Sequence, residues 1–217
     1  MNVARLTTRL TVAAMATVMV TTAAAAPAQA TTKPLAQRSL AAVLLKDKSG
    51  FDHNGRDFDI LKSAVLAVLD AKPNSPVKVL TQGQTRLTAF LPTDAAFQQL
   101  AKEATKARKT PSEKKAFSVV AGLGINTVES VLLYHVVPGV RVTKSRALKA
   151  DNVKLKTALG ATIKVDVRHP RHQPAQVWLK DKDTNDRNPR AIVFNINAGN
   201  RQLAHAIDRV LRPVNLP

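Results

Sequence analysis

The sequence contains no cysteine, and this absence excludes disulfide bonds, lipidation on cysteine and any site that needs a thiolate. Stability therefore has to come from an apolar core. Aromatic residues make up only 4% of the chain, with Trp178 as the single tryptophan, so the stacking platforms that bind unpaired bases are scarce. Since no recognition motif is present either, we expect no specific nucleic-acid partner.

Known catalytic motifs are also missing. Ser130 lacks the flanking glycines of a hydrolase nucleophile elbow, and the chain has no glycine-rich phosphate loop and no paired zinc motif. The sequence therefore predicts a protein without catalysis and without a cofactor. Asp and His residues far apart in the chain could still converge in the fold, so an exported hydrolase stays open as an alternative.

Two short segments have a partial metal-binding pattern. Asp181, Asp183 and Asn185 match the first three liganding positions of an EF-hand loop, but the glycine of its sharp turn and its closing glutamate are absent. His169 and His172 have a spacing that suits a metal only on a helix, which the neighbouring prolines discourage. We expect a solvated hairpin loop at the first segment and no metal site at either.

The first thirty residues are typical of an export signal. Arg5 and Arg9 give a positive start, residues 10–20 form an apolar run, and residues 28–30, Ala-Gln-Ala, are small enough for signal cleavage. An uncleaved membrane anchor is the alternative, although the run is rich in Thr and Ala. We predict a secreted protein, extracellular or surface-associated, with no transmembrane segment after cleavage.

Basic residues dominate the remaining chain. The whole sequence has 33 Lys and Arg against 15 Asp and Glu, and loss of Arg5 and Arg9 leaves a net charge of +16. Such a charge attracts polyanions, and the attraction weakens as salt rises. The alternative is a general contribution to solubility. The candidate polyanion-binding residues are Lys102, Lys106, Arg108, Lys109, Lys114 and Lys115, followed by Arg168 and Arg171.

The hydrophobic periodicity of the first part favours helices. The pattern predicts one helix within 35–44 and a clearer one over 60–69. A third is expected from a capping box at Thr110, with Pro111 as its first residue, to about residue 121. A fourth is expected up to residue 135 after a cap at Asn126.

Strands are expected on both sides of these helices. A short strand is predicted at 77–80, and an apolar one at 87–91 leads into a helix whose free amides Thr93 or Asp94 would cap. Later alternation predicts strands at 163–167, 177–179 and 192–194 and a less regular one at 207–210. Helices come first and strands follow, which predicts an α+β fold.

Three segments carry a family resemblance. They read TAFLPTDAAF at 88–97, LLYHVVPG at 132–139 and AIDRVLRP at 206–213, and together they resemble the fasciclin (FAS1) family of extracellular adhesion modules, in a secreted, bacterial-type, single-domain form. The resemblance implies a wedge of β-strands with a helical layer on one side. Arg201 and Gln202 occupy the positions of the family's usual Asn-Gly pair, so we expect a remodelled turn there.

The resemblance also implies candidate site residues: Thr93, Asp94, Tyr134 and His135 are family-motif positions, adhesive or structural. In animal members a Tyr-His segment at this place has been linked to integrin-dependent adhesion. The family's second adhesion element, an Asp-Ile pair, is absent because residues 98–133 contain no Asp. A His in the last turn of a helix is well placed against the helix dipole and satisfies nearby carbonyls, which favours a structural role.

These observations predict one domain with no internal repeat. The expected division is a signal peptide at 1–30, a short lead at 31–38, a fasciclin-like domain at 39–213 and a tail at 214–217. The expected function is adhesion, or binding to extracellular matrix or a cell surface, through a basic surface that docks on an anionic polysaccharide or an extracellular partner protein. A carrier of small ligands, with a cleft between helices and sheet, is the other alternative.

Overall fold

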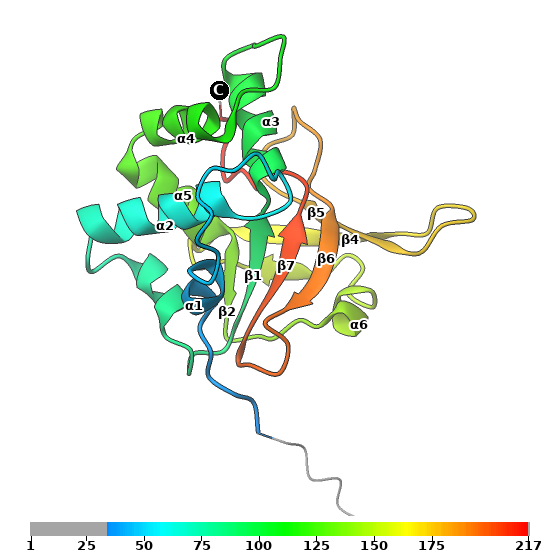
Figure 1. Cartoon of the computed structure of the whole chain (residues 1–217). Helices are drawn as coiled ribbons and strands as arrows, with labels where there is room; N and C mark the ends of the chain where they lie inside the picture. The colour runs from blue at the N-terminus through cyan, green and yellow to red at the C-terminus, as the bar shows by residue number, and fades with distance from the viewer. Residues whose placement is uncertain (1–33, 217) are drawn as a thin grey trace, which may run out of the picture. The chain divides into compact units, whose positions relative to one another are not determined.

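The strands of this protein form two sheets, seen in the computed structural model that describes residues 34–216 (Figure 1). The four-stranded sheet has the order β2-β1-β7-β6, and the three-stranded sheet has the order β3-β4-β5. Their bounds are β1 Leu87–Pro92, β2 Val136–Pro138, β3 Lys154–Lys156, β4 Thr162–Arg168, β5 Gln176–Lys180, β6 Ala191–Ile196 and β7 Gln202–Ile207. The predicted export signal at 1–30 and residues 31–33 lie outside the described residues.

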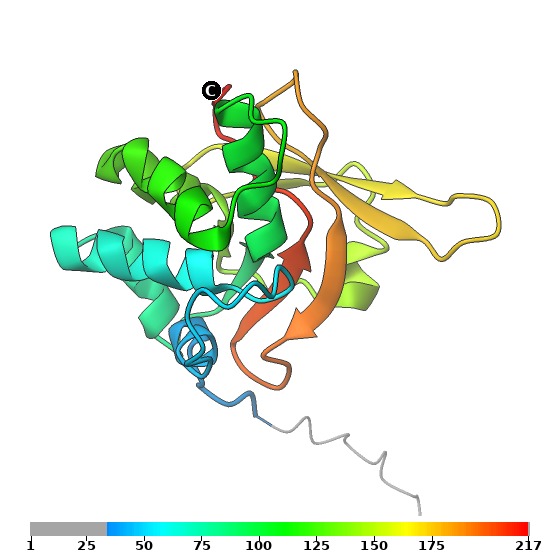
Figure 2. The ribbon, with the colours of Figure 1, turned by 45° about the horizontal axis from the view of Figure 1, so that its top comes forward.

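Helices cover one face of the four-stranded sheet, as Figures 1 and 2 show. They are α1 Leu40–Leu44, α2 Asp59–Ala71, the 3₁₀ helix η1 Pro76–Thr81, α3 Asp94–Ala104, α4 Glu113–Gly122 and α5 Ile125–Tyr134, while α6 Lys144–Ala147 follows β2. Together with the sheets, this arrangement confirms the predicted α+β fold. Among the described residues no single helix is long and apolar enough to cross a membrane.

The strand β1 lies at the centre of the molecule and has apolar contacts on both faces. Leu87, Ala89 and Leu91 belong to the core between the helices and the sheet, whereas Phe90 belongs to a second core between the two sheets. Because side chains alternate along a strand, this explains the apolar run that the sequence shows. The neighbour of β1 on one side is β2, antiparallel, and on the other side β7, parallel.

The structure corrects two of the predicted elements. Residues 77–80 form part of η1 rather than a strand, because Pro76 opens the turn and the Ser75 hydroxyl accepts a bond from the Val77 amide at 3.2 Å. The helix α4 starts after Ser112, whose hydroxyl accepts from Lys115 N–H, and not at the Thr110 capping box.

Three further corrections concern the bounds of α5, α1 and the last strand. α5 starts after Gly124, which has a φ of 84°, so the predicted cap at Asn126 is wrong. α1 is shorter than the predicted 35–44 and begins after a Ser39 cap. The last strand covers 202–207 and stops where the sequence pattern placed its start.

The segment that precedes α1 is bound to the turn between β6 and β7. Ala36 N–H donates to Gly199 O at 2.8 Å, and Arg38 N–H donates to the Asn200 side chain at 2.8 Å. The turn has left-handed φ values of 63° at Asn197 and 80° at Gly199. Residues 34–38 therefore pack on the domain that they precede.

Gln202, which stands in place of the family's usual glycine, is fully buried. Its side-chain oxygen accepts from Leu40 N–H at 2.7 Å, and its amide nitrogen donates to Val79 O at 2.8 Å and to Gln82 O at 2.9 Å. One side chain thus joins β7, α1 and η1.

Candidate functional site

The first family-motif pair lies where β1 ends and α3 begins. Thr93 is the residue before the first turn of α3, but its side chain makes no capping bond. Asp94 also does not cap α3, because its two carboxylate oxygens accept from the amides of Asp59 at 3.0 Å and Ile60 at 2.9 Å. The expected cap of the following helix is therefore wrong: Asp94 caps α2, which lies beside it.

The second family-motif pair is buried. The Tyr134 hydroxyl donates to Thr162 O on β4 at 3.1 Å, and burial raises the pKa of this phenol. The His135 ring lies between the Val131 carbonyl, 2.7 Å from Nδ1, and the Leu211 amide, which donates to Nε2 at 2.9 Å. Neither side chain reaches the surface in this structure. Tyr134 joins the end of α5 to β4, and His135 joins α5 to the segment that follows β7.

The basic candidates divide into two groups on different elements. Lys102, Lys106, Arg108, Lys109, Lys114 and Lys115 lie at the end of α3, in the α3–α4 connection and at the start of α4, and all except Lys102 are exposed. Arg168 and Arg171 are exposed at the end of β4 and in the β4–β5 turn. Figures 1 and 2 place the connection at the top and the hairpin projecting to the right, so these residues form two surfaces.

The β5 strand carries a cluster that the sequence analysis missed. Three guanidinium groups lie over the ring of Trp178: Arg168 at 4.3 Å, Arg187 at 4.9 Å and Arg190 at 5.8 Å from its centroid. We call these four residues the Trp178 arginine cluster. Such cation–π contacts hold arginines in place without neutralising their charge.

Two carboxylates neutralise part of the charge of the Trp178 arginine cluster. Arg168 pairs with Asp166 at 2.8 Å, and Arg190 lies 3.6 Å from Asp208. Arg187 has no ion pair among residues 34–216. The cluster therefore has a net positive charge at the surface. Trp178 faces Asp166 across the β4–β5 ladder, and the isolated bridge between Trp178 and Arg190 connects β5 to the segment before β6.

A buried ion-pair centre fixes the segment that brings Arg187 to this cluster. The Arg212 guanidinium contacts Glu103, with which it forms a hydrogen bond, and lies 3.3 Å from both Asp183 and Asp186. Arg212 N–H also donates to Asp181 at 2.8 Å. We call these five residues the Arg212 centre. Because Arg187 directly follows Asp186, the Arg212 centre positions one member of the Trp178 arginine cluster.

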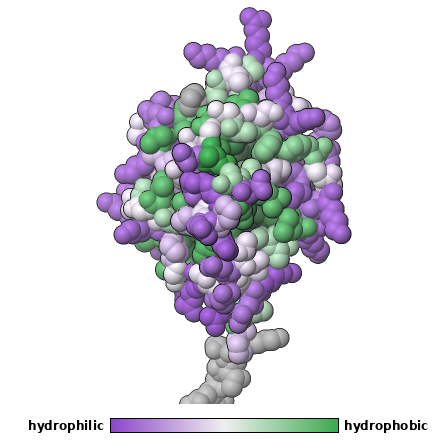
Figure 3. Space-filling view, turned by 90° about the vertical axis from the view of Figure 1, so that its left-hand side faces the viewer, coloured by the Kyte–Doolittle hydropathy of each residue, from purple (hydrophilic) through white to green (hydrophobic). Residues whose placement is uncertain are grey.

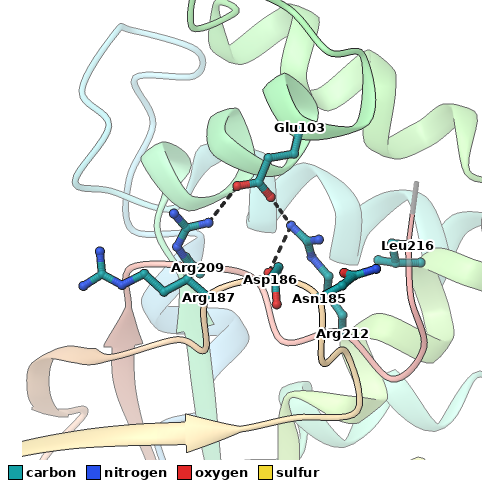
Figure 4. Close-up of a pocket in the computed structure, with 7 residues that line it drawn as sticks. All are labelled: Glu103, Asn185, Asp186, Arg187, Arg209, Arg212 and Leu216. Carbon is teal, nitrogen blue, oxygen red and sulfur yellow. Dashed lines mark hydrogen bonds and ion pairs between the residues drawn. The ribbon is translucent and has the colours of Figure 1, made fainter.

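An open cavity of about 430 Å³ lies beside the Arg212 centre. Figure 4 shows Arg209 and Arg212 both directed toward Glu103, while Arg187 points away from it. Burial raises the pKa of Asp181 to about 7, and the neighbouring Asp186 and Asp183 add to the increase. Its lining contains both carboxylates and guanidinium groups, which form ion pairs with one another.

The structure places the residues of both partial metal-binding patterns. Asp183 is buried against Arg212, so the segment expected to be a solvated loop instead surrounds a guanidinium group. Asn185 donates its backbone N–H to Asp183 at 3.1 Å. His169 and His172 lie exposed in the β4–β5 turn.

The helical face differs from the surface that carries the Trp178 arginine cluster. Figure 3 shows hydrophobic and hydrophilic residues intermixed over this side of the molecule. Leu45 and Leu66, two large exposed apolar side chains, line a shallow groove between α1 and α2.

Comparisons with known proteins agree with this architecture. The model of the Fasciclin domain matches residues 62–213, more than two thirds of the chain, so the protein belongs to the fasciclin-domain family. Fasciclin domains are generally involved in cell adhesion. No curated protein sequence matches the chain.

A solved structure shows the same fold. The chain is similar to the FAS1 domain pair of the insect cell adhesion molecule Fasciclin I, with a TM-score of 0.54 and 16% sequence identity. The match covers 80% of this chain and 50% of the insect structure, so this chain spans about half the length of that pair. At this identity the similarity supports the FAS1-like fold, and it assigns no partner.

Proposed function

We propose that this protein is an exported adhesion protein, and that its Trp178 arginine cluster binds an acidic polysaccharide of a matrix or cell surface. Three guanidinium groups over one indole ring carry the proposal. Planar guanidinium groups form paired hydrogen bonds with carboxylate and sulfate groups. An array of three such groups suits a polymer with repeated negative charges.

The arrangement of the cluster supports this choice over a diffuse charge effect. Arg168 comes from β4, Arg190 from the segment before β6 and Arg187 from the connection between β5 and β6. Their guanidinium groups converge on one ring, and two carboxylates, Asp166 and Asp208, are paired with the three arginines, so part of their mutual repulsion remains. A polyanion reduces this repulsion, so its binding is strengthened by the same geometry.

The test compares two variants that remove equal charge. The triple variant Arg168→Gln, Arg187→Gln and Arg190→Gln removes the cluster, and the triple variant Lys106→Gln, Arg108→Gln and Lys109→Gln removes charge from the α3–α4 connection. We expect the first variant to lose affinity for heparin and polygalacturonate by about tenfold or more, and the second by less than about threefold.

The fluorescence of Trp178 gives a direct readout, because it is the only tryptophan of the chain. In the wild type, binding should change this fluorescence and should weaken steeply between low and high salt. Neutral dextran serves as the uncharged control, and thermal unfolding confirms that both variants fold. Equal losses in the two variants, or binding that ignores salt, would contradict the proposal.

A further inference from the structure

Three helices begin at one point of the structure, and each begins with a buried acidic residue. Asp59 is the first residue of α2, Asp94 of α3 and Glu113 of α4. Their side chains are at most 1% exposed. One carboxylate oxygen from each lies within 4.8 Å of the others. We call these three residues the acidic junction.

Hydrogen bonds satisfy only part of the acidic junction. Both oxygens of Asp94 accept from the amides that open α2, and one oxygen of Glu113 accepts from His53 N–H at 3.1 Å. Asp59 Oδ2 and Glu113 Oε1 are buried without any hydrogen-bond partner. A buried carboxylate oxygen without a partner is costly, and a cation bound between them would give both of these atoms a partner.

The charge around the acidic junction leads to the same conclusion. Asp52 and Asp57 lie beside Asp59, with liganding oxygens within 4.8 Å of one another. Of these five carboxylates, only Asp59 has an ion pair among residues 34–216, with Lys62 at 2.5 Å. The positive ends of the three helix dipoles offset part of the remaining charge. Five of the 15 acidic residues of a strongly basic chain thus meet at one place.

We propose that the acidic junction binds a divalent cation, with Ca²⁺ as the best fit. All of its donors are oxygens, the ligands that hard cations prefer. The liganding oxygens of the three carboxylates all lie within 4.8 Å of one another, close enough to share one cation that sits about 2.3–2.6 Å from its oxygen ligands. Mg²⁺ needs a smaller shell and keeps more of its own water.

The loop before α2 provides the way in. Asp52 is exposed and Asp57 is half-buried, whereas Asp59 is buried and shared by both groups of carboxylates. The Asp57 carboxyl also lies within hydrogen-bonding reach of the Asp94 carboxyl. A cation arriving from solvent would therefore meet Asp52 first and reach Asp59 and Glu113 behind it.

The site can be tested with calcium alone on the full chain. Protein treated with EDTA is titrated with CaCl₂ by calorimetry at constant ionic strength, and its thermal midpoint is measured with and without Ca²⁺. We expect saturable binding, and at a hundredfold excess over Kd a midpoint higher by about 5 °C or more. Absence of a saturable heat and of any midpoint shift would overturn the proposal.

Two variants separate binding from folding. Glu113→Gln keeps an oxygen to accept the His53 amide, and Asp52→Asn lies at the exposed mouth, where folding tolerates it. Glu113→Gln should weaken Ca²⁺ binding by about tenfold or more and Asp52→Asn by a smaller factor, whereas Asp70→Asn, exposed on α2, should leave it unchanged. Equal binding by all three variants would overturn the site.

The thermal midpoints add a reversal that a purely structural role would not give. In EDTA, Glu113→Gln should be at least as stable as the wild type, because it removes one repelling charge. In saturating Ca²⁺, the wild type should be the more stable of the two. A variant that is less stable in EDTA and by the same amount in Ca²⁺ would show that Glu113 acts only within the fold.

Discussion

His135 is a case in which a family-motif residue has its chemistry set by two backbone groups. Nδ1 faces the Val131 carbonyl, so it has to carry the proton, and Nε2 has to be the acceptor for Leu211 N–H. Both roles are filled by the neutral ring. Burial lowers the pKa of His135 to about 4 from its ordinary 6.5. The charged interaction with the helix dipole that the sequence suggested is therefore absent at neutral pH.

This lowered pKa makes a prediction for stability. Between pH 6.5 and pH 4 the unfolded chain binds a proton at His135 that the folded chain does not, so the contribution is complete above pH 6.5 and is lost as the pH falls. Compared with His135→Gln, whose amide can donate and accept in the same places, the wild type should lose about 3 kcal/mol of unfolding free energy between pH 7 and pH 4.

Urea denaturation at a series of pH values measures this difference. Asp94 and Asp181 contribute in the opposite direction, because burial raises their pKa values, but they are present in both proteins and cancel in the comparison. Parallel pH profiles for the wild type and His135→Gln would show that His135 does not titrate in this window.

At the scale of the elements, the sequence predicted those whose pattern depends on burial. The strands β1, β4 and β5 and the helix α2 lie where the apolar period placed them. The errors concern starts and ends that depend on local hydrogen bonds. The hydroxyls of Ser75 and Ser112 accept hydrogen bonds from backbone amides and so cap their helices. Each segment contains several residues of types that can cap a helix, so the sequence pattern alone could not show which of them does.

One of these connections depends on a glycine for a close backbone approach. A Cβ at Gly83, which follows η1, would lie 1.6 Å from the carbonyl oxygen of Gln37, whereas a Cβ at Gly122 would have no atom within 4 Å. We expect Gly83→Ala to lower the free energy of unfolding by about 2 kcal/mol or more, because the segment before α1 would have to move.

Gly122→Ala is the matched control. It should raise stability by about 0.4–1 kcal/mol, since alanine restricts the unfolded chain and fits the last residue of α4. Chemical denaturation of the two variants gives both values. A loss of the same size in both would mean that the contact between Gly83 and Gln37 is not tight.

At the scale of the whole molecule, Gln202 connects parts that are distant in the sequence. Gln202→Leu would leave the Leu40 amide and the carbonyls of Val79 and Gln82 without their buried partner. We expect a loss of about 2–4 kcal/mol in unfolding free energy. The exposed Gln84→Leu should change it by less than about 0.5 kcal/mol, and similar values for both would refute the role of Gln202.

The candidate site was less predictable than the fold. The sequence indicated Arg168, but the grouping with Arg187 and Arg190 depends on a β5–β6 connection whose path is fixed by Arg212. The acidic junction was missed for a similar reason, because Asp59 and Glu113 are 54 positions apart and meet only when three helices start together. Tertiary packing brings each of these two groups of residues together, and no local sequence pattern predicts it.

The parallel pairing of β1 with β7 has a consequence for how the protein is made. Leu87 pairs with Gln202, so β1 has no parallel neighbour until β7, more than a hundred residues later, has been synthesised. Contacts of such long range slow folding. A growing chain on the ribosome therefore cannot complete the four-stranded sheet until the last strand emerges. Until then it is incompletely folded, which is the form of a polypeptide that a translocation channel can carry.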